Sequence, residues 1–154
     1  MTPFEQAPPT DPASRLVLRL VGAVLALAVL AAAMWFAWLG WDDDYHLVDG
    51  VPQGPYRAWQ VIGCAVSIAL AAVLAQLWVR RAWAMVLLAP AAVIGFAVPW
   101  GVDAAASDDS GLWVVGLLFL LVGGGVALLV VLAVTAAVAS VVARRDARGG
   151  TPSR

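Results

Sequence analysis

Long apolar segments alternate with short polar ones along the chain. Four segments carry no charged residue, namely 20–41, 58–79, 82–102 and 112–143. Because a helix rises 1.5 Å per residue, about 20 residues cross a hydrocarbon core of about 30 Å. The pattern therefore predicts four membrane-spanning helices. The last segment would reach about 48 Å as one helix, so its span is expected to tilt or to leave the membrane near residue 136.

The first apolar segment has one rival interpretation, a cleaved signal peptide. Arg15 and Arg19 precede it, and Ala31-Ala32-Ala33 is similar to a cleavage site. Secretory signals have apolar regions of about 7–15 residues. The segment here is longer and continues to Trp41, which favours an uncleaved helix.

The polar stretches set the expected domain organisation. Residues 1–15 hold four prolines and few large apolar side chains, a composition typical of a disordered tail. The predicted transmembrane domain is 16–143, with spans at about 20–41, 58–79, 82–102 and 112–136, and a basic tail occupies 144–154. The predicted fold class is an all-α membrane protein, an antiparallel bundle of four transmembrane helices.

Composition agrees with this fold class. The 154 residues are 63% hydrophobic and 12% charged, with a mean hydropathy of +0.90. Soluble domains average about 25% charged residues. Cys64 is the single cysteine, so no disulfide can form within the chain.

The arginines predict the orientation. If the chain crosses four times, eight of its nine basic residues fall on one side, leaving only Arg57 on the other. That side is expected to be cytoplasmic. The formal charges are then about +5 inside and −6 outside. Both termini are therefore predicted to be cytoplasmic, in a multi-pass protein of the cell (inner or plasma) membrane.

The loop at 42–57 carries the densest candidate chemistry. Its possible extracytoplasmic contact residues are Asp42, Asp43, Asp44, His46 and Asp49. Carboxylates and imidazole can bind hard or borderline cations, but the spacing matches no calcium loop. A solvated acidic loop, a weak cation or partner contact, and a metal site remain alternatives, and the first is favoured, with no metal bound tightly.

The same loop contains a hairpin signal. Asp49-Gly50 suits the type I′ turn of a short hairpin, and Pro52 limits its second arm. We expect a hairpin-like flap packed by Tyr45, Leu47 and Tyr56 over the outer ends of the helices.

The apolar segments contain no ionisable residue apart from Cys64. A proton-coupled exporter needs a membrane-embedded carboxylate, so this class is disfavoured. The pattern also predicts no catalytic residue, no cofactor, no metal ligand and no nucleic-acid partner.

Small residues predict where helices pack. Gly63 and Ser67 lie on one face of the second span, and Gly123, Gly124 and Gly125 are consecutive in the fourth. Small side chains let two helix backbones approach in lipid. These five residues are the expected packing residues, within one chain or between chains, whereas Ala28 in the first span is expected to face lipid.

Two junctions carry a family resemblance. They are Gly54-Pro55-Tyr56-Arg57-Ala58-Trp59-Gln60-Val61-Ile62-Gly63-Cys64 and Asp108-Asp109-Ser110-Gly111-Leu112-Trp113. Here the chain resembles small four-span integral membrane proteins of actinobacteria, a family of uncharacterised activity. The resemblance implies an inner-membrane location and no particular reaction.

The expected function is that of a non-enzymatic accessory or structural membrane protein. It would act through the lipid bilayer, a membrane-protein partner or a homo-oligomer. The alternative is a small-solute or ion transporter that works as an oligomer without an intramembrane titratable group. A polar tunnel would favour the transporter, and a dry core of alanine, valine and leucine would favour the accessory protein.

Overall fold

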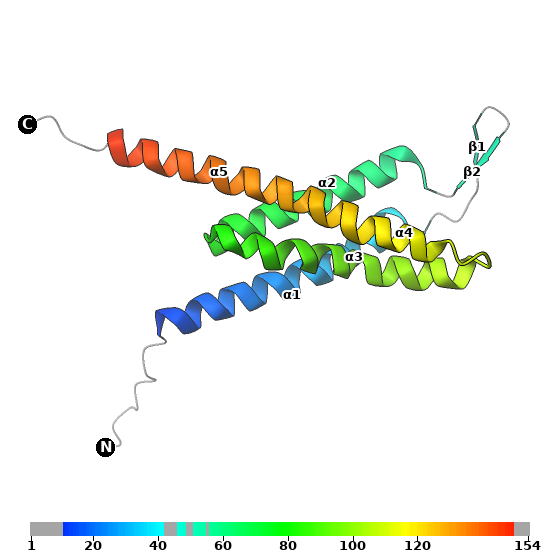
Figure 1. Ribbon diagram of the computed structural model, residues 1–154, viewed down its shortest axis with the longest axis horizontal. Coiled ribbons are helices and arrows are strands. Elements are labelled where there is room, and N and C mark those ends of the chain that lie inside the picture. Colours follow the sequence, from blue (N-terminus) through cyan, green and yellow to red (C-terminus); the bar gives the residue numbers. More distant parts are fainter. Residues whose placement is uncertain (1–10, 42–45, 49–50, 55, 150–154) are drawn as a thin grey trace, which may run out of the picture.

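The computed structural model describes residues 11–41, 46–48, 51–54 and 56–149, and for 46–48, 51–53 and 149 it describes the backbone only. The elements in chain order are α1 (Pro12–Trp38), β1 (His46–Val48), β2 (Val51–Gln53), α2 (Ala58–Val79), η1 (Ala82–Ala84), α3 (Met85–Ser107), α4 (Trp113–Phe119), η2 (Leu120–Gly124) and α5 (Gly125–Gly149). The helix η1 is a single 3-10 turn that leads into α3, and η2 is a π-helical segment between α4 and α5. Four long apolar helical segments result, and they run antiparallel, so α1 begins and α5 ends at the same end of the molecule (Figure 1). The predicted all-α four-helix fold is confirmed.

The helices extend past the uncharged segments that predicted them. Pro12 starts α1, at a position where its fixed φ suits a helix and its missing N–H is not needed. The helix thus includes the last residues of the expected tail, while 1–10 lie outside the described residues. At the other end, α3 continues through Asp103 to Ser107, where a loop was expected. Only α2 has the same bounds as its uncharged segment.

The fourth span is the longest. Together α4, η2 and α5 form a helix of 36 residues from Trp113 to Arg148, which is about 54 Å long. The end of α5 reaches beyond the other helices in Figure 1. Arg144, Arg145 and Arg148 lie on this end, so the helix continues into the segment expected to be a tail.

The core forms mainly around α1. Its buried residues recur at every fourth position, at Ala23, Leu27, Ala31, Trp35 and Leu39, which places them on one stripe of the helix. This stripe packs against α2 and α3. By contrast, Leu132 is the one buried residue among the described residues of α5. The bundle is therefore tight around α1 and open along α5.

The expected hairpin is present between α1 and α2. Strands β1 and β2 pair antiparallel, with His46 opposite Gln53 and Val48 opposite Val51, so residues 49 and 50 connect them. The strands stand clear of the helices in Figure 1 instead of covering their ends. Tyr56 packs against the core, whereas Tyr45 and the side chain of Leu47 lie outside what the structure describes.

Candidate functional site

The acidic outer loop can be placed only in part. Asp42, Asp43, Asp44 and Asp49 lie outside the described residues, and His46 is described only as backbone in β1. Within the described ranges, no group of three or more His, Cys, Asp or Glu residues could hold a metal ion. The contact proposed for this loop stays a prediction.

Gly63 packs against an aromatic ring. A Cβ at Gly63 would overlap the indole of Trp38 and lie 2.6 Å from its Cη2 atom. The Trp38 ring also meets Trp59 edge to face, at a centroid distance of 6.2 Å. Ser67 donates its hydroxyl to the carbonyl oxygen of Gly63 at 2.7 Å, within its own helix. A small residue is therefore needed at Gly63 to seat a tryptophan from α1.

The three consecutive glycines do not form the close crossing that we expected. Cβ atoms at Gly123 and Gly125 would meet nothing within 4 Å, and one at Gly124 would make an ordinary 3.7 Å contact with Val93. The helix instead becomes π-helical at Leu120–Gly124. Such bulges insert a residue into the helix, and glycine adapts to them at little steric cost.

Among the described glycines, the one that meets the backbone of another helix lies elsewhere, between α1 and α3. A Cβ at Gly95 would overlap the carbonyl oxygen of Ala28 and lie 2.7 Å from its Cα atom. Ala28 was expected to face lipid, and this expectation is wrong. Gly95 is the only glycine in the middle of its span, which is a usable signal, but α1 has so many alanines that none of them identifies the partner position.

An apolar groove runs between α2, α3 and the π-helical region. Its volume is about 410 Å³. We call it the α2–α5 groove, and its lining includes Cys64, Ile68, Val93, Phe96, Gly124 and Leu128. Exposed apolar residues such as Val66 and Val131 also line it, so the groove opens at the surface of the helices. Sequence reasoning singled out Gly124 but missed the groove, because the groove depends on how far α2 and α5 diverge.

Two glutamines are the buried polar residues among those whose side chains are described. The side-chain Oε1 atom of Gln60 accepts a 2.6 Å hydrogen bond from the Arg57 backbone N–H and thereby caps the start of α2. The amide of Gln76 lies 3.4 Å from the carbonyl oxygen of Ala82 and 3.5 Å from that of Leu132. Its own Oε1 atom has no hydrogen-bond partner. Gln76 thus links α2 to η1 and to α5, in each case by one long, weak bond.

Cys64 is buried beside the groove and makes no acid–base pair. Its thiol lies 3.8 Å from the carbonyl oxygen of Met34, the acceptor of a weak S–H hydrogen bond. Trp35 on α1 is also buried, and its indole N–H has no partner. Both residues act as core side chains between α1 and α2.

Asp108 organises the connection between α3 and α4. Its carboxylate accepts hydrogen bonds from the Ser110 hydroxyl, from the Ser110 N–H at 2.8 Å and from the Trp113 N–H at 2.7 Å. These bonds, with the Ser110 hydroxyl first, lower the pKa of Asp108 from its ordinary value of 3.8. Gly111, at a φ of 76°, supplies the left-handed residue of the turn. Asp108 thus caps the start of α4 through the Trp113 N–H. The sequence predicted only a loop here and did not assign this role to Asp108.

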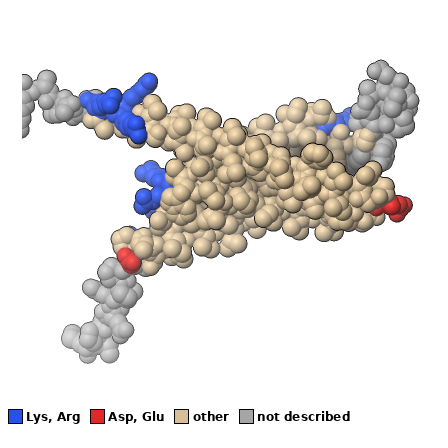
Figure 2. Space-filling view, viewed as in Figure 1, with Lys and Arg blue, Asp and Glu red and all other residues tan. Residues whose placement is uncertain are grey.

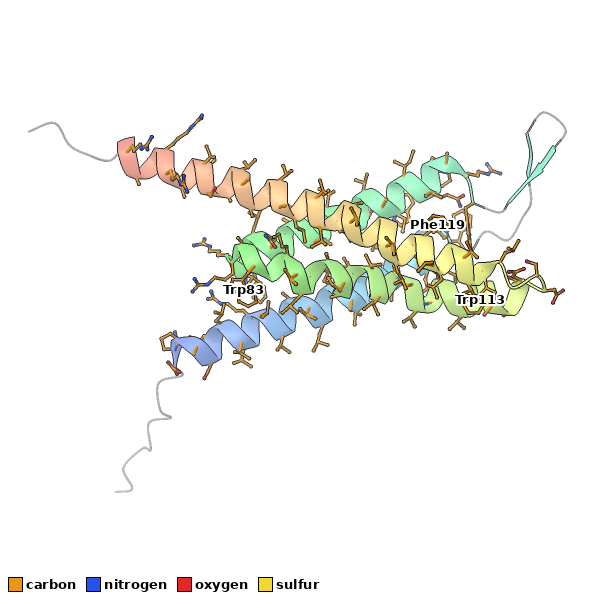
Figure 3. All side chains as sticks on the ribbon, in the orientation of Figure 1. Trp83, Trp113 and Phe119 are labelled. Carbon is orange, nitrogen blue, oxygen red and sulfur yellow. The ribbon has the colours of Figure 1, made fainter. Side chains whose placement is uncertain are left out.

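The surface separates an apolar middle from polar ends. Figure 2 shows charged side chains at the two ends of this face, mostly blue with a red group where α1 begins and α5 finishes, and both red and blue at the opposite end, with a broad tan region between them. Phe119 is 73% exposed and Val29 70% exposed in this apolar region. Trp83 and Trp113 lie near opposite ends (Figure 3), as tryptophans do at the two membrane interfaces.

Comparisons with protein-family models, with curated proteins and with solved structures find no match to this chain. The resemblance to actinobacterial four-span proteins therefore stays a prediction. The class of this protein follows from its own structure. Four helices long and apolar enough to span a bilayer, with large apolar side chains facing outward, define a multi-pass membrane protein.

Proposed function

We propose that this chain is a non-enzymatic accessory or structural protein of the cell membrane, with both termini in the cytoplasm. It acts through contacts with a membrane-protein partner, with a second copy or with lipid. The resemblance to small actinobacterial four-span proteins belongs to the same proposal.

The observation that carries the proposal is the α2–α5 groove. It is lined by apolar side chains throughout and opens sideways between helices. In a bilayer such a surface is filled by a helix or by acyl chains, because packing and not the hydrophobic effect holds helices together in lipid. The sparse burial of α5 supports a partner on this side, since much of its surface is left for other contacts.

The described core also disfavours transport. Its buried residues are mainly alanine, leucine and valine, and the two buried glutamines lie at opposite ends of α2. A polar solute would need a continuous row of hydrogen-bonding groups across the membrane. The apolar groove offers no such row along its lining.

The arginines support the orientation. Figure 2 shows most of its basic side chains at the end of the molecule where α1 begins and α5 finishes, and by the positive-inside rule this end faces the cytoplasm in our proposal. The acidic side chains of the α3–α4 connection lie at the opposite end.

The test is photo-crosslinking in native membranes. A photoreactive amino acid replaces Ala127, which lines the groove, and in a matched variant it replaces Val98, an exposed residue on α3 outside the groove. We expect the Ala127 position to give one discrete product, whose intact mass identifies a protein, a second copy or a lipid. Equal yields from both positions would contradict the proposal. Solute flux into proteoliposomes in proportion to the protein would replace it with the transporter alternative.

A further inference from the structure

Four arginines line one pocket at the end of the molecule where α1 begins and α5 finishes. The pocket, about 310 Å³ in volume, lies between the start of α1 and the turn from α2 to η1. It is lined by Arg15, Arg19, Arg80 and Arg81 together with Leu16 and Val79. We call it the arginine pocket. The positive-inside rule requires basic residues on this side of the membrane but not at any particular place. Their position around one cavity is therefore an additional property of the fold.

Local structure explains the gathering. Arg15 and Arg19 are one helical turn apart on α1, so their side chains leave the same face. On the other side, Arg80 ends α2 in a left-handed conformation with φ 56°, and its N–H donates to the carbonyl oxygen of Gln76 at 3.0 Å. It is the one non-glycine residue with positive φ among the described residues. The tight turn brings Arg80 and Arg81 to the start of α1.

Three of the four arginines that line the pocket keep an uncompensated charge within the described part of the chain. Within the described residues, the side chains of Arg19, Arg80 and Arg81 form no ion pair. Like charges around one cavity repel each other, and an anion between them removes this repulsion. Guanidinium groups match phosphate oxygens with paired N–H donors, which makes phosphate the best fit.

The rest of the lining selects the source of the phosphate. Val79 is 3% exposed and Leu16 is half-buried, so one side of the pocket is apolar. The pocket also lies where the uncharged segments of α1 and α2 meet their arginines, at the depth of the headgroups. A phospholipid has a phosphate beside an apolar chain, whereas a free phosphate ion has nothing to place against Leu16 and Val79.

We propose that the arginine pocket binds the phosphate headgroup of an anionic phospholipid in the cytoplasmic leaflet. The inference deepens the proposed function, since it rests on lipid being one of the partners and names the lipid's class and site. Arg19 lies on α1 and Arg81 in the turn between α2 and η1, so a bound lipid joins the start of α1 to this turn. The α2–α5 groove lies outside this site and shares no lining residue with it.

The experiment measures lipid binding to the full chain in mild detergent by native mass spectrometry. The probes are dioctanoyl phosphatidylglycerol, dioctanoyl phosphatidylcholine and inorganic phosphate. We expect phosphatidylglycerol to bind most tightly, and more weakly as salt rises. Phosphatidylcholine bound as tightly would overturn the proposal, and phosphate bound as tightly would show a site for free anions instead of lipid.

Two double variants locate the site. Arg19 and Arg81 line the pocket, and a basic side chain close to an anionic headgroup contributes about 1 kcal/mol, so R19Q with R81Q should weaken phosphatidylglycerol binding about thirty-fold. The matched control, R144Q with R145Q, removes the same charge from α5 and should change the affinity by less than about threefold. Equal losses in both pairs would show general attraction to the charged end and overturn the pocket.

A third pair guards against misfolding. R19K with R81K keeps both charges but loses the paired donors, so it should bind more tightly than the glutamine pair and less tightly than the unaltered chain. If the lysine pair binds no better than the glutamine pair while melting like the unaltered chain, charge at these positions does not hold the lipid, and the proposal is wrong. If the arginine pocket does not bind lipid, the crosslink expected at Ala127 in the α2–α5 groove is unchanged. The lipid site and the proposed function can therefore fail separately.

Discussion

Gly95 on α3 lies directly against the backbone of Ala28 on α1, with no room for a side chain between them. A Cβ at Gly95 would lie 2.8 Å from the Ala28 carbonyl carbon, closer than real contacts allow. The two helices therefore cross at backbone distance, which strengthens dispersion where lipid offers no hydrophobic drive. This crossing fixes the most tightly packed pair of helices in the bundle.

Gly95→Ala should destabilise the protein by about 1–3 kcal/mol, because an added methyl group must force α1 and α3 apart. The control is Gly22→Ala on α1, where a Cβ meets nothing within 4 Å. Thermal unfolding in one detergent compares the two variants with the unaltered chain. Similar melting temperatures for both variants would show that the crossing is looser than the structure has it.

Gly63 and Trp38 should be energetically coupled. Gly63→Ala pushes against the Trp38 ring and should lower the melting temperature, whereas the same change in a Trp38→Leu background should have a much smaller effect. Residues in contact give coupling free energies of about 0.5–3 kcal/mol in such double-mutant cycles. Additive effects in the four-protein cycle would mean that the indole does not occupy this position.

The Asp108 cap should make the α3–α4 connection sensitive to acid. The pKa of Asp108 is lowered in the folded chain, so the carboxylate stabilises the connection above its ordinary pKa of 3.8. This stabilisation is lost as the pH falls through the lowered folded-state pKa. The Ser110 and Trp113 amide protons, which donate to the carboxylate, should report the change in an NMR titration with a midpoint below 3.8.

The Asp108→Asn variant is the control for that titration, because it has no carboxylate to protonate. Its Ser110 and Trp113 amide signals should show no such transition. A midpoint at or above 3.8 in the unaltered chain would contradict the hydrogen bonds assigned to the cap.

The sequence predicted the membrane-spanning segments, because an uncharged apolar run of about 20 residues is as long as the hydrocarbon core is thick. It could not predict where each helix ends. Hydropathy marks the membrane core, while helices continue through charged residues such as Asp103 and Arg144 as long as their backbone bonds are satisfied. The hairpin register was predictable because Asp49-Gly50 favours a two-residue connection, which the strand pairing has.

Packing was harder to predict than topology. Alanine occurs on every face of α1, so the sequence does not show that Ala28 is the residue of α1 that contacts Gly95. Three glycines in the fourth span suggested a close crossing, but their helix becomes π-helical, and a Cβ at Gly124 would make only an ordinary contact with Val93. The arginine pocket was equally hidden, because it depends on the left-handed turn at Arg80, a conformation that arginine seldom adopts.

The most direct test of the account maps which parts of the chain lie on each side of the membrane. In a Cys64→Ser background, single cysteines replace Ser14, Gln53, Ala106 and Ser153, and an impermeant thiol reagent is applied to intact cells. The account predicts labelling at positions 53 and 106 only, with positions 14 and 153 labelled after the cells are opened. Labelling of position 14 or 153 in intact cells would contradict four spans with both termini inside.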